Sequence, residues 1–138
     1  MKKAIILYLG LLLAGVSASG QSVVSWPCSD ELTKTEGDNH RIRVSVSVTQ
    51  AMVQKKVLPD GSDLKGTKTK SAVILRALIG KDGNVRCADP AQGDSSLFER
   101  SVNAAKLWHF QPYLLNGQPI IVETTIEFEF NKNKVTAK

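Results

Sequence analysis

The sequence has little of what metal sites and nucleotide-binding sites require. Its 138 residues include two cysteines, two histidines and no glycine-rich phosphate-binding loop. The four candidate metal ligands have none of the close spacings that hold a zinc ion. They are Cys28, His40, Cys87 and His109. We therefore expect neither a metal nor a cofactor.

An activated nucleophile is also missing from the sequence pattern. Ser95, Ser96 and His109 are the residues a hydrolase could use, but no nucleophile, base and orienting acid are arranged together. Ser96 is better explained by helix capping. His109 lies between Trp108 and Phe110 and is interpreted as a packing residue. We expect no enzymatic activity and no catalytic residue.

Long apolar runs are absent except at the amino terminus. There, two lysines precede the apolar run Ala4–Val16, and small residues follow up to Gly20. This order is typical of a secretory signal peptide, and the run is shorter than the roughly 20 residues that cross a bilayer. We expect residues 1–20 to be a signal peptide, cleaved after Ala18 or Gly20. The mature protein would be periplasmic or secreted, and would associate with membranes only through partners or an uncleaved signal segment.

The charge balance does not favour a nucleic-acid-binding protein. Without residues 1–20, the chain has 16 basic and 13 acidic residues, a net charge of +3. Lysines gather between Lys55 and Lys70, but no aromatic residue lies among them. We interpret this stretch as a solvated loop and expect no nucleic-acid partner.

The cysteine pair suggests a disulfide. In an oxidising compartment an even pair is more often bridged than free, which favours a bond between Cys28 and Cys87. The alternative is a buried thiol at Cys87 and a mobile thiol at Cys28.

Residues 21–70 are predicted to form an arm, a strand and a loop. Residues 21–40 are mostly polar and suggest an extended arm. Apolar and polar residues alternate from Arg41 to Thr49, the pattern of a half-buried strand. The stretch Pro59–Lys70 is polar with two glycines and predicts a loop.

A β-hairpin is predicted next. The nearly continuous apolar run Ala72–Ile79 indicates a central strand. Asp82-Gly83 is a strong hairpin-turn signal. The return strand, Val85–Ala88, is short, and Pro90 after it favours a position at the edge of a sheet.

A helix and a closing strand follow. Ser96 and Glu99 have the spacing of a capping box, and Pro112 ends any helix. The apolar residues of the helix share one face: Phe98, Val102 and Ala105. After an Asn-Gly turn, Val122–Phe130 alternates strictly between apolar and polar residues, so one face should pack on the helix. The expected fold is α+β: a small antiparallel sheet (hairpin plus closing strand) with one main helix packed on it, plus an extra N-terminal strand.

This order of elements resembles the C-terminal domain of the TonB energy transducers. The resemblance covers residues 71–131 and is carried by the hairpin, the stretch "LFERSVNAAKLWHFQP", the turn "LLNGQPI" and the strand "VETTIEF". The most specific element is the pattern of Trp108, Phe110 and Pro112. Residues 21–70 precede this domain as the arm, the extra strand and the polar loop. The sequence departs from the family in lacking a long spacer and, where the family has a first helix, has Pro59 and a polar loop.

The resemblance implies a protein-binding module. Such domains grip an extended segment of an outer-membrane receptor or other envelope protein by strand addition on the last strand. The residues expected to bind the partner lie on that strand: Val122, Glu123, Thr124, Thr125, Ile126, Glu127 and Phe128. A link to TonB-dependent outer-membrane transport is the first expectation. A self-associating structural protein of the envelope is the alternative, and a small secreted enzyme is less favoured.

The extra strand raises the question of whether the binding edge is free. Ile42–Val48 has the alternation needed to occupy the edge of Val122–Phe130 itself. In that arrangement the edge is closed and a partner must displace the strand; otherwise the edge is open.

Export gives a testable prediction. We expect the mature protein to begin at Ser19 or Gln21, because two small-residue sites follow the short apolar run. Intact-mass measurement of protein from its native envelope tests this. A full-length species held in the inner membrane would contradict it.

Overall fold

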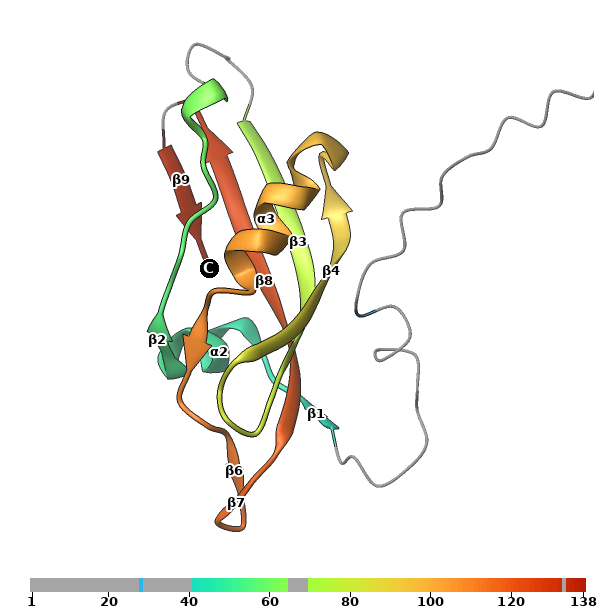
Figure 1. Ribbon diagram of the computed structural model, residues 1–138, viewed down its shortest axis with the longest axis vertical. Helices are drawn as coiled ribbons and strands as arrows, with labels where there is room; N and C mark the ends of the chain where they lie inside the picture. Colours follow the sequence, from blue (N-terminus) through green and yellow to red (C-terminus); the bar gives the residue numbers. More distant parts are fainter. Residues whose placement is uncertain (1–27, 29–40, 65–69, 133) are drawn as a thin grey trace, which may run out of the picture.

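Two long strands form the centre of the sheet. The computed structural model describes Cys28 and residues 41–64, 70–132 and 134–138. Strand β3 (Lys70–Ile79) pairs antiparallel with β8 (Ile121–Asn131) over ten successive residue pairs. On its other side β3 pairs with β4 (Val85–Gly93), which confirms the predicted central strand (Figure 1).

The β3–β4 turn forms where the Asp-Gly signal predicts it. The Gly80 N–H donates to the Asn84 carbonyl at 2.8 Å, and the Asp82 carboxylate accepts from the Asn84 N–H at 3.1 Å. Gly83 has a φ of +83°, a conformation that favours glycine. The hairpin itself is therefore confirmed.

Strand β4 is longer than the predicted Val85–Ala88. It continues through Pro90 to Gly93, with shifts of register at two places along its pairing with β3. In the strand order β1-β8-β3-β4, β4 is the edge strand and has a neighbour on one side only. Pro90 can therefore be part of this strand, although it has no N–H to donate. The predicted position of this strand at the edge of the sheet is confirmed, whereas its predicted length was wrong.

The main helix begins differently from the predicted capping box. Asp94, not Ser96, is the cap: its carboxylate accepts from the Ser96 N–H at 3.0 Å. A 3-10 turn, η2 (Ser95–Leu97), leads into α3 (Phe98–Ala105), whose own first residue has no side-chain cap. The physical reason is that Asp94, two residues before Ser96, accepts from a backbone N–H in the first turn, which here is a 3-10 turn.

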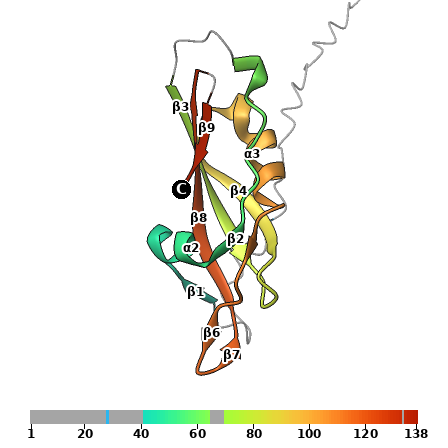
Figure 2. The ribbon, with the colours of Figure 1, turned by 90° about the vertical axis from the view of Figure 1, so that its left-hand side faces the viewer.

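Helix α3 covers one face of the sheet, as Figure 2 shows with the sheet seen nearly on edge. The buried side chains between helix and sheet alternate along the strands, in agreement with the predicted faces. They include Val73, Leu75, Ala77, Ile79, Val102, Ala105, Val122, Ile126, Phe128 and Phe130. Trp108 closes this core against the Phe128 ring at a centroid distance of 5.8 Å.

Residues 53–64 run alongside α3 (Figure 1). Strand β2 (Val53–Lys55) pairs with β5 (His109–Phe110), and the Trp108 Nε1–H donates to the Val57 carbonyl at 2.8 Å. The 3-10 turn η1 (Ser62–Leu64) is held by Arg100, whose guanidinium bonds both oxygens of Asp63. The predicted loop Pro59–Lys70 is thus docked on the helix where it is described.

The predicted strand Arg41–Thr49 is wrong over most of its length. Only β1 (Arg41–Arg43) is extended, and helix α2 (Val46–Met52) follows. Ser45 caps α2, and the Thr49 hydroxyl donates to the Ser45 carbonyl at 3.0 Å. The β-branched residues of this stretch favour a strand, but the cap and the contact of Thr49 with the sheet override that local preference.

Two elements complete the fold. Strands β6 (Leu114–Leu115) and β7 (Gln118–Pro119) form a small hairpin around the Asn-Gly turn. Strand β9 (Lys134–Ala137), which the sequence patterns did not reveal, pairs antiparallel with β8. The α+β class and the extra N-terminal strand are confirmed. Among the described residues, no helix is both long enough and apolar enough to cross a membrane.

The β3–β4 turn gives a stability prediction. In Gly83→Ala, the new Cβ would lie 1.9 Å from the Phe110 carbonyl oxygen, in addition to the strain of the positive φ. We expect a loss of about 3 kcal/mol in the free energy of unfolding. Gly117→Ala is the control, because Gly117 has a φ of +77° with nothing within 4 Å of the added Cβ. It should cost about 1 kcal/mol. Urea unfolding of both variants measures the difference, and equal losses would contradict the prediction.

Candidate partner-binding edge of the sheet

The seven residues predicted to bind a partner all lie on β8. Val122, Ile126 and Phe128 point into the core beneath α3 and are fully buried. Glu123 and Glu127 alternate with them and are half-buried on the opposite face. The face of β8 toward α3 is therefore buried in the core. A partner can reach β8 only along its outer edge or from the other face.

The first part of the outer edge is occupied by β1. Arg41, Ile42 and Arg43 pair in parallel with Ile121, Val122 and Glu123. The Val44 N–H extends the ladder by donating to the Glu123 carbonyl at 2.9 Å. In the closed arrangement, the N-terminal strand covers the outer edge of β8. The structure shows β1 at this edge, but it covers only three residues of it.

The last part of the same edge is occupied by β9. The pairs run from Phe128 with Ala137 to Asn131 with Lys134. Glu127 and Lys138 add two reciprocal backbone hydrogen bonds of 3.0 and 2.9 Å. Between the two short strands, no strand of the described chain pairs with Thr124, Thr125 or Ile126 on this side.

Helix α2 lies beside this gap through a buried polar contact. Thr49 is the one buried residue of α2, and its hydroxyl bonds the hydroxyl of Thr124. Thr124 also donates to the Val44 carbonyl at 3.3 Å. Tyr113 is buried in the same region, and this burial raises the pKa of its hydroxyl. The buried polar contact of Thr49, together with the partly buried Met52 that packs against the core, therefore holds α2 beside β8.

Two glutamates of β8 are paired with cations, one on β1 and one directly after β9. Arg43 Nη2 lies 2.9 Å from Glu123 Oε1, and Lys138 Nζ lies 2.6 Å from Glu129 Oε1. The hydrogen bond from Lys138, its charge and the charge of Lys70 lower the pKa of the Glu129 carboxyl. Each strand that covers the edge, or the residue that follows it, thus brings a positive charge to a carboxylate of β8.

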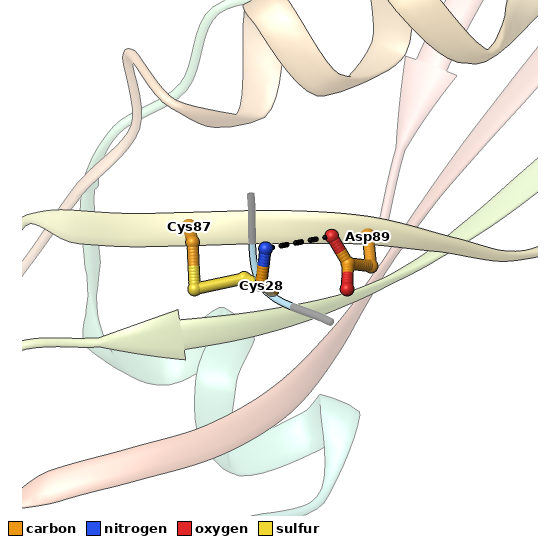
Figure 3. Close-up of a disulfide and its surroundings, with 3 residues drawn as sticks. All are labelled: Cys28, Cys87 and Asp89. Carbon is orange, nitrogen blue, oxygen red and sulfur yellow. Dashed lines mark hydrogen bonds between the residues drawn. A yellow bond between two sulfur atoms is a disulfide. The ribbon is translucent and has the colours of Figure 1, made fainter. Parts of the chain in front are cut away.

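The opposite edge of the sheet carries the disulfide. Cys28 and Cys87 are bonded, with their Cα atoms 5.3 Å apart, which confirms the predicted bridge. Figure 3 shows the Cys28 N–H directed at the carboxylate of Asp89 on β4, a hydrogen bond of 3.0 Å. Both cysteines pack with Leu78 and Ile121 in a second small cluster, on the face of the sheet away from α3. Cys28 therefore covers part of the face of the sheet that α3 leaves open.

Two of the residues considered for catalysis, Ser96 and His109, have other partners. The Ser96 hydroxyl donates to Asp94 Oδ1 at 2.7 Å, and His109 Nδ1 lies 2.9 Å from Asn84 Oδ1. In the part of the chain that the structure describes, no three His, Cys, Asp or Glu residues are grouped to hold a metal ion. The predicted signal peptide, the rest of the arm and His40 lie outside the described residues.

The comparison with known families decides the classification. Residues 63–131, half of the chain, match the family described as the Gram-negative bacterial TonB protein C-terminal. The chain belongs to this family. TonB C-terminal domains are non-enzymatic protein-interaction domains of the envelope that bind proteins such as outer-membrane receptors. Searches of the curated proteins and of the solved structures found no match to this chain.

Two features along the outer edge of β8 lie outside the stretch that matches the family. Both β1–α2 and β9 lie beyond residues 63–131. Sequence reasoning missed α2 and β9, although each has a weak signal: Ser45 is a good N-cap residue, and the turn before β9 is rich in Asn and Lys, with Lys132 at a φ of +51°. These additions occupy the edge on which the family resemblance places partner binding.

The pairing of Glu129 gives a pH prediction. Because its pKa is depressed in the folded state, the pair stabilises β9 at neutral pH, and this contribution is lost as the pH falls below 4.5 and through the folded-state pKa. We expect an NMR titration to place the Glu129 pKa below 4.5, and Lys138→Gln to return it toward that value. Lys134→Gln, at the other end of β9, is the control and should leave the Glu129 pKa lowered. An unperturbed Glu129 in the unsubstituted protein would contradict the prediction.

Proposed function

We propose that this protein captures an extended segment of an envelope protein by strand addition at the outer edge of β8, in the service of TonB-dependent outer-membrane transport. The contact residues are those of Val122–Phe128. Main-chain hydrogen bonds supply the affinity, and the alternate side chains on the exposed face supply the selectivity.

One observation carries this proposal: the outer edge of β8 is covered by two short strands with a gap between them. Three residue pairs hold β1 and four hold β9, whereas ten hold β3 on the other side. At rest, β1 and β9 satisfy backbone groups of β8 on either side of the gap, and only the few hydrogen bonds of these short strands must be exchanged for those of a partner. The β4 edge is less suited to strand addition, because Pro90 on this strand has no N–H to donate to a partner.

Site-specific cross-linking tests the proposal. A photo-reactive residue in place of Thr125 sits on β8 in the gap between β1 and β9, so a partner strand would lie next to it. We expect it to trap an envelope protein in native cells, and mass spectrometry should locate the linkage in one extended segment of that protein. A photo-reactive residue in place of Asn103, exposed on α3, is the matched control and should trap nothing.

Two outcomes would overturn the proposal. Equal yields from both positions would show that capture is unspecific, and no cross-link from position 125 would leave the edge without a partner. A cross-link to a second copy of this chain would support self-association instead.

A further inference from the structure

Strand β1 is an extended segment already bound at the proposed binding edge. It runs parallel to β8, with Ile42 opposite Val122, and continues the ladder through the Val44 N–H. An external segment that pairs with Val122 and Glu123 would need the same hydrogen-bonding groups. The two segments cannot occupy this part of the edge together.

The hold of this segment on the sheet is weak. The side chain of Arg43 is 76% exposed and Ile42 is 37% exposed, so β1 buries little apolar surface. Thr49 is the one fully buried residue of α2, and it is polar; Val44 and Met52 pack against the core but are only partly buried. A hydrogen bond contributes only about 1 kcal/mol net to stability, so these contacts give the segment a low local stability compared with the core.

Both flanks of the segment are anchored independently of its contact with β8. On one side, Cys28 is bonded to Cys87. On the other side, the Gln111 N–H donates to the Met52 carbonyl at 2.8 Å, and β2 pairs with β5 directly afterwards. A displaced segment would remain tethered near the edge, at an effective concentration on the order of millimolar, and would return when a partner leaves.

Glu123 adds a chemical requirement to this exchange. Its side chain is only 13% exposed, and its carboxylate is paired with Arg43. When β1 leaves, Arg43 leaves with it, and a half-buried carboxylate without a cation is unfavourable. A partner segment with Lys or Arg at the position of Arg43 restores the pair, whereas one with an acidic residue there adds repulsion.

We propose that residues 41–49 are a built-in competitor for the β8 edge, and that Glu123 makes this edge selective for extended segments with a basic residue in the place of Arg43. The inference rests on the function proposed above and names the chemistry of the partner. The pairing of β1 with β8 indicates the register and the charge that a partner segment needs at this edge.

Two hexapeptides serve as probes in NMR titrations of the full chain. The first, Arg-Ile-Arg-Val-Ser-Val, copies residues 41–46, and the second has Glu at its third position. The variant Arg43→Glu places like charges side by side and should open the edge. We expect it to bind the basic peptide about three- to tenfold more tightly than the unsubstituted protein does, and more tightly than it binds the acidic peptide. Shifts should concentrate on β8.

Two further variants control the experiment. Lys106→Glu makes the same charge change on an exposed residue at the end of α3 and should leave peptide binding as in the unsubstituted protein. The double variant Arg43→Glu with Glu123→Arg restores an opposite-charge pair. It should return to the low affinity of the closed edge and prefer the acidic peptide.

The possible failures are distinguishable. Arg43→Glu could bind both peptides equally well, and more tightly than the unsubstituted protein does. That result would overturn the charge selectivity, but residues 41–49 would remain a competitor and the proposed function would stand. Unchanged affinity in Arg43→Glu would overturn the competitor, since binding would then occur without displacement of β1. If neither peptide binds although hydrogen exchange of the Val44 amide shows that the edge has opened, the proposed function fails together with this inference.

Discussion

The pairing of β3 with β8 is the interaction on which the rest of the structure depends. Ten residue pairs in one unbroken register bring the buried alternate positions of both strands to the same face. Helix α3 and Trp108 can then cover a continuous apolar surface, where each Å² removed from water contributes roughly 25 cal/mol. A shift of one residue in this register would turn the glutamates of β8 into the core and the phenylalanines toward water. The same pairing leaves the other side of β8 as an edge that must be covered.

The two edges of the sheet are protected in different ways. At β4, protection is permanent: Pro90 lacks an N–H, and the disulfide holds Cys28 against the strand, with a contribution of about 4 kcal/mol on the chain-entropy model. At β8, protection comes from short strands, polar contacts and exposed ion pairs. Contacts of this kind prevent unspecific edge-to-edge association and still allow exchange. The difference between the edges fits a module in which only one edge is used for binding.

The charges of β8 connect its protection with its selectivity. Glu123 and Glu129 lie on the face away from α3; Glu123 is paired with Arg43 of β1, and Glu129 with Lys138, the residue after β9. When a partner segment displaces β1 or β9, the cation leaves together with the displaced strand. The carboxylates therefore favour a partner that supplies its own positive charge, and this requirement follows from the geometry of the covered edge.

The sequence by itself determined the elements whose signals are local. The apolar run of β3, the Asp-Gly and Asn-Gly turns and the strict alternation of β8 specify the central sheet, because turn residues and a period of two act within a few residues. The cysteine pair also indicated its bridge correctly. Tertiary structure alone decided that α2 is a helix despite its β-branched residues, that β1 is only three residues long, and that β9 pairs with another part of β8. Those outcomes depend on contacts of Thr49 with Thr124, Arg43 with Glu123 and Lys138 with Glu129, between residues that no local pattern brings together.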